Sequence, residues 1–320
     1  MYFIFRPGTL GDQAVLKNVL KNFPIEKENF VLIERSHKGR AFASSYRDYF
    51  NIFSSIYVYN NAFDLFTLLL NIRKKYGKQD LIYLPHSSKR SIRFFIDLLL
   101  FSLAFTINIR GVLEFYRVRW KSGIVVSEYD RLLRILSKSI GVESQGGVPR
   151  AKESYSEAQR KIVIAPCSAW PSKDWDKKNF QTLIQILDEM GAEIHLMGGK
   201  NDPLQSYYSQ DLMNKIKLHQ GEQLISIEKC IESADVFIGV DSALSHMACG
   251  LDVPSIILYS DTNRREDWKP STARVIGIKC YVKCGGCFSH DCKNFRHECM
   301  DGITVELVMA AYQQLFGGLK

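Results

Sequence analysis

The chain has 320 residues, 46% of them hydrophobic and 24% charged, which excludes a disordered or fibrous protein and allows one or two domains with large cores. Residues 1–150 hold 23 Lys and Arg against 12 Asp and Glu, whereas residues 151–320 hold 19 against 22. The net charge of +8 therefore comes from the first half, which predicts an anionic partner: a phosphorylated glycolipid, a membrane surface or nucleic acid. The alternative is a basic surface that only keeps the protein in solution. No secretory signal is expected, because the apolar run at residues 2–5 is too short.

The first half alternates between strand and helix patterns. Residues 2–5 predict a strand, residues 6–12 a loop and residues 12–22 a helix. The loop glycines allow a ligand to approach the backbone, but they do not form the Gly-x-Gly-x-x-Gly fingerprint, so NAD is not an expected cofactor. Asp12 is either a helix cap or a carboxylate at the end of the first strand, where open α/β sheets bind their ligands.

More strands are predicted before residue 110, with helices between them. The strands fall at residues 30–33, 55–59, 80–84 and 106–109, and the helices at residues 63–76 and 91–103. This alternation predicts a parallel sheet with helices on both faces. The apolar residues 92–109 are nearly long enough for a membrane span, but Asp97 and Asn108 favour a buried or interfacial helix followed by a strand.

Basic side chains lie in the loops that follow these strands, where they are candidates to hold anionic groups. They are Arg35, Lys38, Arg40, Lys89, Arg90 and Arg93. No helix-turn-helix pattern and no interleaving of aromatic and basic residues favours nucleic acid as the partner.

A second strand–loop–helix series follows residues 141–160, which lose apolar periodicity and predict a boundary between domains 1–150 and 151–320. Its strands are expected at residues 162–165, 193–197, 237–240 and 254–259, and its helices at residues 179–190, 226–233, 242–250 and 304–316. The repetition predicts an α/β protein with two similar domains that face each other across a cleft.

The segment 237–248 combines a buried strand with a helix start. Asp241 and Ser242 favour the first turn of a helix, whose N–H groups and positive dipole end suit a phosphate. An ordinary turn between strand and helix, in which these residues only cap the helix, explains the same pattern. His246 on this helix is either a site residue or a packed side chain.

Four motifs in order resemble those of the ADP-heptose:lipopolysaccharide heptosyltransferases, glycosyltransferase family 9. They are RPGTLGD at residues 6–12, SAWPSKDW at 168–175, GGKND at 198–202 and DSALSH at 241–246. The last is similar to the family's Asp-Ser/Thr-Gly-x-x-His signature. The resemblance implies a GT-B architecture: two Rossmann-like domains with parallel sheets facing a central cleft, the second of which holds most of the nucleotide sugar.

The resemblance also implies roles for single residues. Asp12 would be the general base that removes the proton of the acceptor hydroxyl, and Lys173 the cation that neutralises the departing diphosphate. The candidates for binding the acceptor are Arg6, Lys89 and Arg90. Those for binding the donor are Ser168, Ser242 and Ala243 at the diphosphate, Asp202 at the ribose, and Asp241 and His246 as residues that shape the pocket.

The chain departs from the family pattern in two places. Ala243 stands where the family commonly has glycine, which narrows the space beside the phosphate but still permits an N–H contact. Gln13 and the residues after it stand where the lipopolysaccharide-core enzymes have a histidine, which bears on the acceptor more than on the donor. The transfer is expected to need no metal ion, because a lysine and helix N-termini can neutralise the leaving diphosphate; the family resemblance implies that it is inverting.

All eight cysteines lie in the second half of the chain, and five of them fall in the segment 280–299. Cys284, Cys287, Cys292 and Cys299 follow the spacing C-x2-C-x4-C-x6-C, which suits four thiolates around a structural Zn²⁺ or iron; a reduced loop without metal is the alternative. The resemblance adds that many family members carry such a segment and that some related protein O-heptosyltransferases hold iron in theirs. As in GT-B proteins, the closing helix at residues 304–316 is expected to pack on the first domain.

Together these features predict a cytoplasmic glycosyltransferase, peripheral to the inner membrane, that moves a heptose or a similar sugar from an ADP-sugar donor to a lipopolysaccharide-type anionic glycolipid. One alternative is the same transfer to a Ser or Thr of a protein. The other is a non-catalytic, metal-stabilised module that binds polyanions, against which the intact set of Asp12, Lys173 and Asp202 argues.

Overall fold

The computed structural model describes residues 1–26, 29–36, 39, 41–84, 92–107, 127–142, 160–207, 209, 212, 214–262, 274–294 and 296–317. The chain divides into two compact units, Met1–Gly146 and Gly147–Lys320. The predicted domain boundary at residue 150 and the basic residues Lys89 and Arg90 lie outside the described residues.

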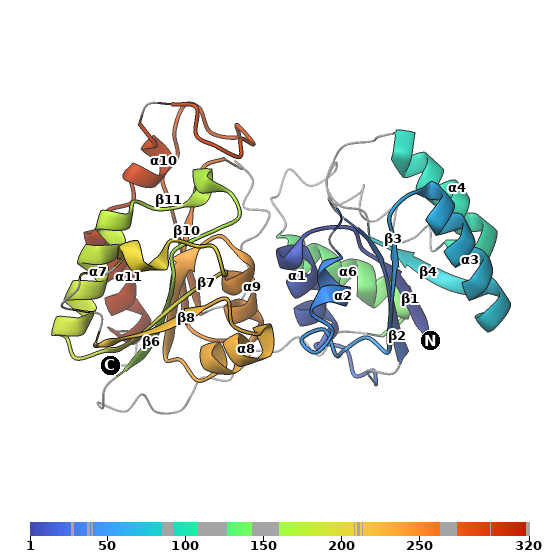
Figure 1. Ribbon diagram of the computed structural model, residues 1–320, viewed down its shortest axis with the longest axis horizontal. Helices are drawn as coiled ribbons and strands as arrows, with labels where there is room; N and C mark the ends of the chain where they lie inside the picture. Colours follow the sequence, from blue (N-terminus) through green and yellow to red (C-terminus); the bar gives the residue numbers. More distant parts are fainter. Residues whose placement is uncertain are drawn as a thin grey trace. The chain divides into compact units, whose positions relative to one another are not determined.

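The first unit is a parallel sheet between two layers of helices (Figure 1). Its elements are β1 (Tyr2–Phe5), α1 (Leu10–Leu20), β2 (Phe30–Arg35), α2 (Phe42–Ser45), β3 (Ser55–Tyr59), α3 (Ala62–Tyr76), β4 (Gln79–Tyr83), α4 (Ile92–Ala104), β5 (Phe105–Ile107) and α6 (Glu128–Ile140). The strand order is β3-β2-β1-β4-β5. Figure 1 shows α3 and α4 on one face of the sheet and α1 and α6 on the other.

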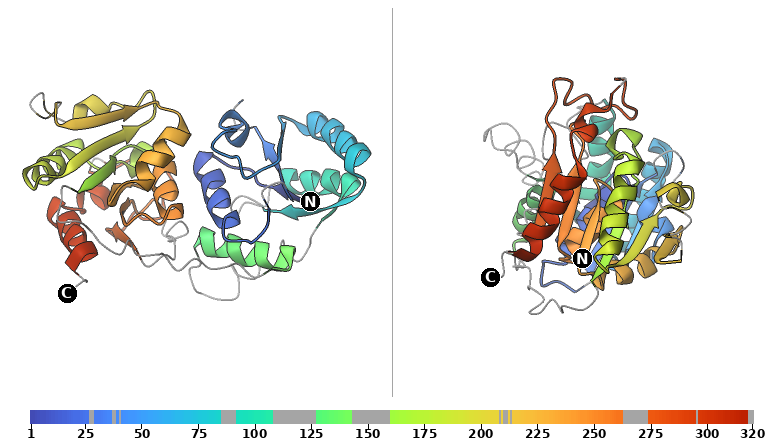
Figure 2. Two further views of the ribbon diagram at one scale, coloured as in Figure 1. Left: turned by 90° about the horizontal axis from the view of Figure 1, so that it is seen from below. Right: turned by 90° about the vertical axis from the view of Figure 1, so that its left-hand side faces the viewer.

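The second unit repeats this plan with six parallel strands in the order β11-β10-β9-β6-β7-β8. Its elements are β6 (Lys161–Ala165), η2 (Pro171–Lys173), α7 (Lys177–Glu189), β7 (Glu193–Gly198), η3 (Leu204–Tyr207), β8 (Ile216–Gln220), α8 (Leu224–Glu232), β9 (Val236–Val240), α9 (Ala243–Gly250), β10 (Ser255–Tyr259), β11 (Val275–Lys279), α10 (Glu298–Asp301) and α11 (Val305–Gly317). Helices α7 and α11 cover one face of this sheet, and α8 and α9 the other (Figures 1 and 2).

Both sheets have the strand order of a Rossmann fold. In each unit the first strand is central, the next strands are added outward on one side of it, and the remaining strands are added outward on the other side. This reversal of direction falls between β1 and β4 in the first sheet and between β6 and β9 in the second. Ligands of such sheets bind at the carboxyl ends of the two strands on either side of the reversal. The loops after β1, β6 and β9 carry three of the four motifs, so the topology alone places these motifs at the expected binding edges.

The buried side of each strand explains why these segments form parallel sheets. All five residues of β9 are buried, as are four of the five residues of β6, which is typical of strands covered on both faces. The core of the first unit is rich in aromatic side chains: the ring of Phe5 lies 4.9 Å from that of Tyr83 and 4.8 Å from that of Phe101.

The prediction of two Rossmann-like α/β units is confirmed, and so are the predicted strands and helices, with small shifts at their ends. The elements absent from the sequence-based prediction are the helices α2, α6 and α10, the short helices η2 and η3, and the strands β8 and β11. In β8 only Ile216 is buried, so the strand lacks the continuous apolar run that marks a central strand.

The C-terminal helix contributes to the core of its own unit. The side chains of Val308, Ala311 and Tyr312 are buried in the core of the second unit, where α11 packs against α7, β10 and β11. The expectation that this helix also packs on the first domain stays a prediction.

Residues 92–107 form the helix and strand that the polar residues in this apolar segment predicted. None of the helices within the described residues has both the length and the apolar character that crossing a bilayer requires. Apolar side chains on the outer faces of α3 and α4 are nevertheless well exposed, notably Phe63, Leu70 and Leu99.

Candidate functional site

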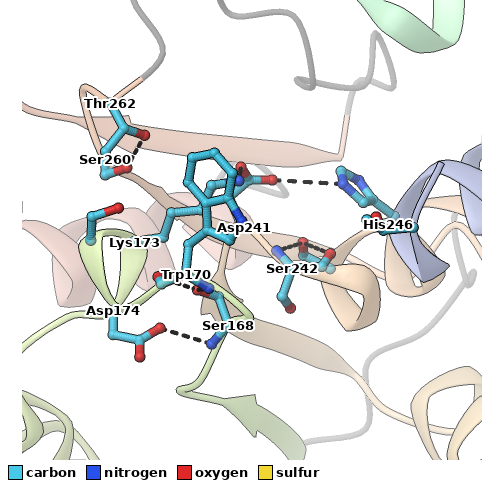
Figure 3. Close-up of polar contacts among 12 residues, drawn as sticks. Ser168, Trp170, Lys173, Asp174, Asp241, Ser242, His246, Ser260 and Thr262 are labelled. Carbon is cyan, nitrogen blue, oxygen red and sulfur yellow. Dashed lines mark hydrogen bonds and ion pairs between the residues drawn. The ribbon is translucent and has the colours of Figure 1, made fainter. Parts of the chain in front are cut away.

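The loop after β6 folds around its own serine and aspartate (Figure 3). The Ser168 N–H donates to Asp174 Oδ1 at 2.8 Å, and the Ser168 hydroxyl donates to the carbonyl of Trp170 at 2.7 Å. Pro171 then starts the short helix η2, which ends at Lys173. The loop therefore presents Lys173 at the carboxyl edge of the sheet, while the Ser168 hydroxyl, expected at the diphosphate, is bonded within the loop.

Lys173 meets the loop after β9 through an ion pair. Its Nζ lies 2.6 Å from Asp241 Oδ2, and the other oxygen of Asp241 lies 3.6 Å from His246 Nε2 (Figure 3). Burial by itself would raise the pKa of Asp241, but the Lys173 ammonium and His246 hold the pKa below the usual value of an aspartate. The structure thus joins three of the predicted residues in one charged group.

The first turn of α9 differs from the expected diphosphate cradle in one bond. The Ser242 N–H donates to Ser245 Oγ at 2.9 Å, so this N–H already has a partner at the helix start. The Ser242 hydroxyl oxygen is buried and has no hydrogen-bond partner within the described residues. The contact of Ala243 with a phosphate stays a prediction.

Asp202 closes its own glycine-rich turn. Its Oδ2 accepts a hydrogen bond from the Gly199 N–H at 2.7 Å, and its side chain packs so tightly against Gly198 that a Cβ there would come within 2.8 Å of the carboxylate. This close approach explains the glycine at residue 198. The predicted contact between Asp202 and a ribose stays a prediction.

In the first unit, Asp12 lies in the first turn of α1 and is 3% exposed. Its Oδ2 accepts hydrogen bonds from the Thr9 N–H at 2.7 Å and from the Thr9 hydroxyl at 3.0 Å. Gly8 has φ +150°, and a Cβ there would lie 2.5 Å from the Asp12 side chain. Asp12 therefore caps α1, and only a glycine at residue 8 leaves room for it.

Arg6 connects Asp12 to α6. Its Nη2 lies 3.4 Å from Asp12 Oδ1 and 2.6 Å from Glu128 Oε1, and the arginine side chain is fully buried. Burial alone would raise the pKa of Glu128, but Arg6 and Arg131 hold it below its usual value. The Nε and Nη1 atoms of Arg6 have no hydrogen-bond partner in the described part of the chain. The contact of Arg6 with an acceptor stays a prediction.

The cysteine-rich segment 280–299 forms hydrogen bonds with the loop after β6 and with the loop after β10. The Ser172 hydroxyl donates to the carbonyl of Ser289 at 2.6 Å, the Gly286 N–H to that of Asp261 at 2.7 Å, and the Phe288 N–H to that of Thr262 at 3.0 Å. The segment thus supports the turn that carries Lys173 and the end of β10. Sequence reasoning missed this role, and Asp261 with it, because no local pattern marks these contacts.

The cysteines themselves are differently placed. Cys284, Cys287 and Cys292 are exposed and Cys299 is buried. Among the described residues, the sulfur atoms of these four do not form a group of three within ligand distance of one another. The predicted zinc or iron site therefore stays a prediction, in which four thiolates would have to draw together around the ion.

The buried carboxyl group of Asp174 should make the free energy of unfolding depend on pH. Burial raises the pKa of Asp174 to about 6, although the bond from Ser168 opposes this shift. The folded chain then binds more protons than the unfolded chain between about pH 4 and about pH 6, so the free energy of unfolding should fall as the pH rises through this range. In Asp174→Asn this part of the fall should vanish, which urea titrations at several pH values would show. Asp252, whose pKa is also raised to about 6 by burial, contributes equally to both proteins, so an unchanged slope would contradict the assignment to Asp174.

Comparisons with known proteins agree with this arrangement. The model of the family "Glycosyltransferase family 9 (heptosyltransferase)" matches residues 136–297, just over half of the chain. The chain is 26% identical over 159 residues to lipopolysaccharide heptosyltransferase 3 of Escherichia coli, a match that covers 46% of this chain and 44% of that protein. The chain thus spans less than half of the length of the curated relatives that it matches.

Solved structures show the same fold over nearly the whole chain. E. coli ADP-heptose lps heptosyltransferase II superposes with a TM-score of 0.63 at 15% identity, covering 98% of both chains. The iron-containing dodecameric glycosyltransferase TibC from enterotoxigenic E. coli superposes with a TM-score of 0.57 at 15% identity, covering all of this chain and 76% of that one. These likenesses confirm the predicted GT-B fold class.

Proposed function

Since the chain belongs to glycosyltransferase family 9, we propose that it transfers a heptose or a similar sugar from an ADP-linked donor to an anionic glycolipid acceptor. The observation that carries this proposal is the group of Lys173, Asp241 and His246 at the reversal of the second sheet, where a Rossmann-like unit binds a nucleotide. The ADP-heptose donor is supported by the names of the relatives that this chain resembles.

The chemistry requires a group that takes up negative charge as the sugar leaves its diphosphate. In the proposed donor complex the Lys173 ammonium turns from Asp241 toward the diphosphate, while His246 keeps its contact with the carboxylate. The positive end of α9 and the unpartnered Ser242 hydroxyl contribute further favourable contacts. These charges develop their full effect in the transition state, so they accelerate the reaction instead of only tightening binding.

The acceptor oxygen attacks the anomeric carbon as the bond from that carbon to the diphosphate breaks. The ADP leaves with the bonding electron pair, and the proton of the acceptor hydroxyl passes to Asp12. Thr9 and Arg6 hold the Asp12 carboxylate in position, so they act as positioning residues. The single displacement inverts the anomeric configuration.

A peripheral place at the cytoplasmic face of the inner membrane belongs to the same proposal. The exposed Phe63 and Leu70 lie on α3, and the exposed Leu99 lies on α4. The last turn of α3 carries Arg73, Lys74 and Lys75. Apolar side chains beside basic ones are typical of surfaces that bind anionic lipids. Co-sedimentation with phosphatidylglycerol vesicles, but not with phosphatidylcholine vesicles, would support it, and no co-sedimentation would contradict it.

Transfer to a Ser or Thr of a protein is the second candidate. The observation that favours it is the cysteine-rich segment, together with the likeness to the iron-containing TibC. Transfer assays with a heptose-deficient lipopolysaccharide core and with an unglycosylated adhesin, run side by side, would decide between the two acceptors.

Donor binding gives the first test of the proposed function. A ligand that binds the folded chain stabilises it by mass action, by roughly 2.7 kcal/mol at a concentration one hundred times its Kd. ADP-heptose and ADP should therefore raise the melting temperature, whereas UDP-glucose at the same concentration should not. A chain whose melting temperature responds to no ADP-sugar would contradict the proposal and favour the polyanion-binding alternative.

A further inference from the structure

Three metal-ligand side chains meet in the second unit, apart from the residues of the proposed donor site. His195 lies on β7, His219 on β8 and Cys230 on α8. His195 is in register with Lys217, so His219, two residues further on, projects from the same face of the sheet. Cys230 on α8 contacts both rings, so that face is the one covered by α8.

The three potential ligand atoms converge. His195 Nδ1 lies 2.8 Å from His219 Nε2, Cys230 Sγ lies 3.3 Å from the first nitrogen and 3.8 Å from the second. They form the single group of three or more such ligand atoms found within the described residues. Their spacing in the sequence carries no recognisable metal-binding pattern.

The outer nitrogen of each imidazole is held by a carboxylate. Glu193 Oε1 lies 3.1 Å from His195 Nε2, and Glu222 Oε1 lies 2.9 Å from His219 Nδ1. Because a carboxylate only accepts hydrogen bonds, both outer nitrogens carry the proton, and in neutral imidazoles both inner nitrogens then carry a lone pair. Two lone pairs that face each other at 2.8 Å repel unless a cation lies between them.

An additional proton on one imidazole is the alternative to a metal ion. His195 is 5% exposed, so a second proton would place a positive charge on a largely buried ring, which disfavours it. The charged groups around the cluster are Glu193, Glu222, Lys217 and Lys161, of which Lys217 pairs with Glu193 and Lys161 donates to Ser233 Oγ at 2.6 Å.

We propose that His195 Nδ1, His219 Nε2 and Cys230 Sγ bind one zinc ion. Zinc takes nitrogen ligands at about 2.0–2.1 Å and sulfur at about 2.3 Å in a tetrahedral arrangement, so the two nitrogens would lie about 3.4 Å apart and each about 3.6 Å from the sulfur. The nitrogen–sulfur distances of 3.3 and 3.8 Å lie on either side of that value, and the two nitrogens, now 2.8 Å apart, would separate by about half an ångström around the ion. The two glutamates complete the arrangement in which a carboxylate orients each metal-binding histidine. One coordination position remains for water. The ion would tie β7, the edge strand β8 and α8 together.

The test uses the full chain, stripped with a chelator and then loaded with Zn²⁺ or with Co²⁺ as a coloured substitute. The variants Cys230→Ser and His219→Gln should each lose one equivalent of bound metal together with the Co²⁺ absorption bands. In the control Cys292→Ser, an exposed cysteine of the segment 280–299, the equivalent that Cys230→Ser loses should remain, whether or not the predicted cysteine-rich site holds an ion of its own, so the two variants separate the two sites. Glu222→Gln, an exposed and mild change, should weaken zinc binding roughly 10- to 100-fold.

A melting curve supplies a second readout. Zn²⁺ should raise the melting temperature of the unchanged chain and of Cys292→Ser, but not that of His219→Gln. If the chain binds no metal, or if the equivalent is lost in Cys292→Ser and kept in Cys230→Ser, the proposal is overturned. Donor binding is measured separately on the same samples and decides only the proposed transferase function.

Discussion

The variant Asp12→Asn is expected to transfer sugar about 10²–10⁴ times more slowly than the unchanged chain, the usual contribution of a general base. Asparagine has nearly the same shape, and its Oδ1 still accepts the hydrogen bonds that Asp12 receives from Thr9. It cannot take the proton of the acceptor hydroxyl. Initial rates with ADP-heptose and an excess of acceptor measure the loss, which should appear in kcat because the donor is held by the second unit.

A matched control separates the loss of the base from damage to a helix start. Asp64 occupies the same position in the first turn of α3, three residues after the capping Asn61, and it is not part of the proposed site. Asp64→Asn should transfer sugar at the unchanged rate. Both variants should keep the same Kd for ADP. An Asp12→Asn protein that retains full kcat would remove Asp12 as the base without touching the donor site.

The second large effect is expected for Lys173→Met, with kcat lowered about 10²–10³-fold, as when one charge-stabilising group is removed from an active site. Methionine keeps the apolar stem of the side chain but leaves the departing diphosphate without its cation. If the ammonium acts mainly in the transition state, kcat and kcat/KM should fall together, and KM should change little. Lys177→Ala, an exposed lysine at the start of α7, is the control and should leave the rates unchanged.

Because Lys173 forms an ion pair with Asp241, the variant Lys173→Met should also have a lower free energy of unfolding. Removing Lys173 leaves the buried Asp241 carboxylate without its ion-pair partner, and such a charge destabilises the folded state. The double variant Lys173→Met/Asp241→Asn should recover stability, because no unpaired charge remains, but not activity. A double variant that regains kcat would show that the single change acted through folding, and Lys173 would lose its proposed role.

Much of the fold could be predicted because its signals are local. The run that becomes β9 is apolar at every position, and a small polar pair follows it directly, so both a central strand and a helix start can be read from neighbouring residues. The edge strand β8 escaped prediction because only one of its side chains is buried. An edge strand is defined by its partner on one side, and a partner cannot be read from local periodicity.

The site was predictable in its residues but not in its contacts. Lys173 was expected at the diphosphate and Asp241 among the residues that shape the donor pocket, but the ion pair between them joins residues 68 positions apart. Arg6 and Glu128 are joined across 122 positions. Both bonds depend on which strands are neighbours and on the path of each loop, which no short stretch of sequence encodes.

The amino-acid sequence alone determined the alternation of strands and helices, the two-unit α/β plan and the edge at which each motif lies, because hydrophobic period and turn residues act over a few positions. Only the tertiary structure decided which polar groups meet. It brought His195, His219 and Cys230 together from three elements with no common spacing, whereas Cys284, Cys287, Cys292 and Cys299, which follow a metal-site spacing, form no group of three ligand atoms among the described residues. The physical reason is that the register of β7 and β8 and the packing of α8 set side-chain distances, and these are properties of the assembled sheet.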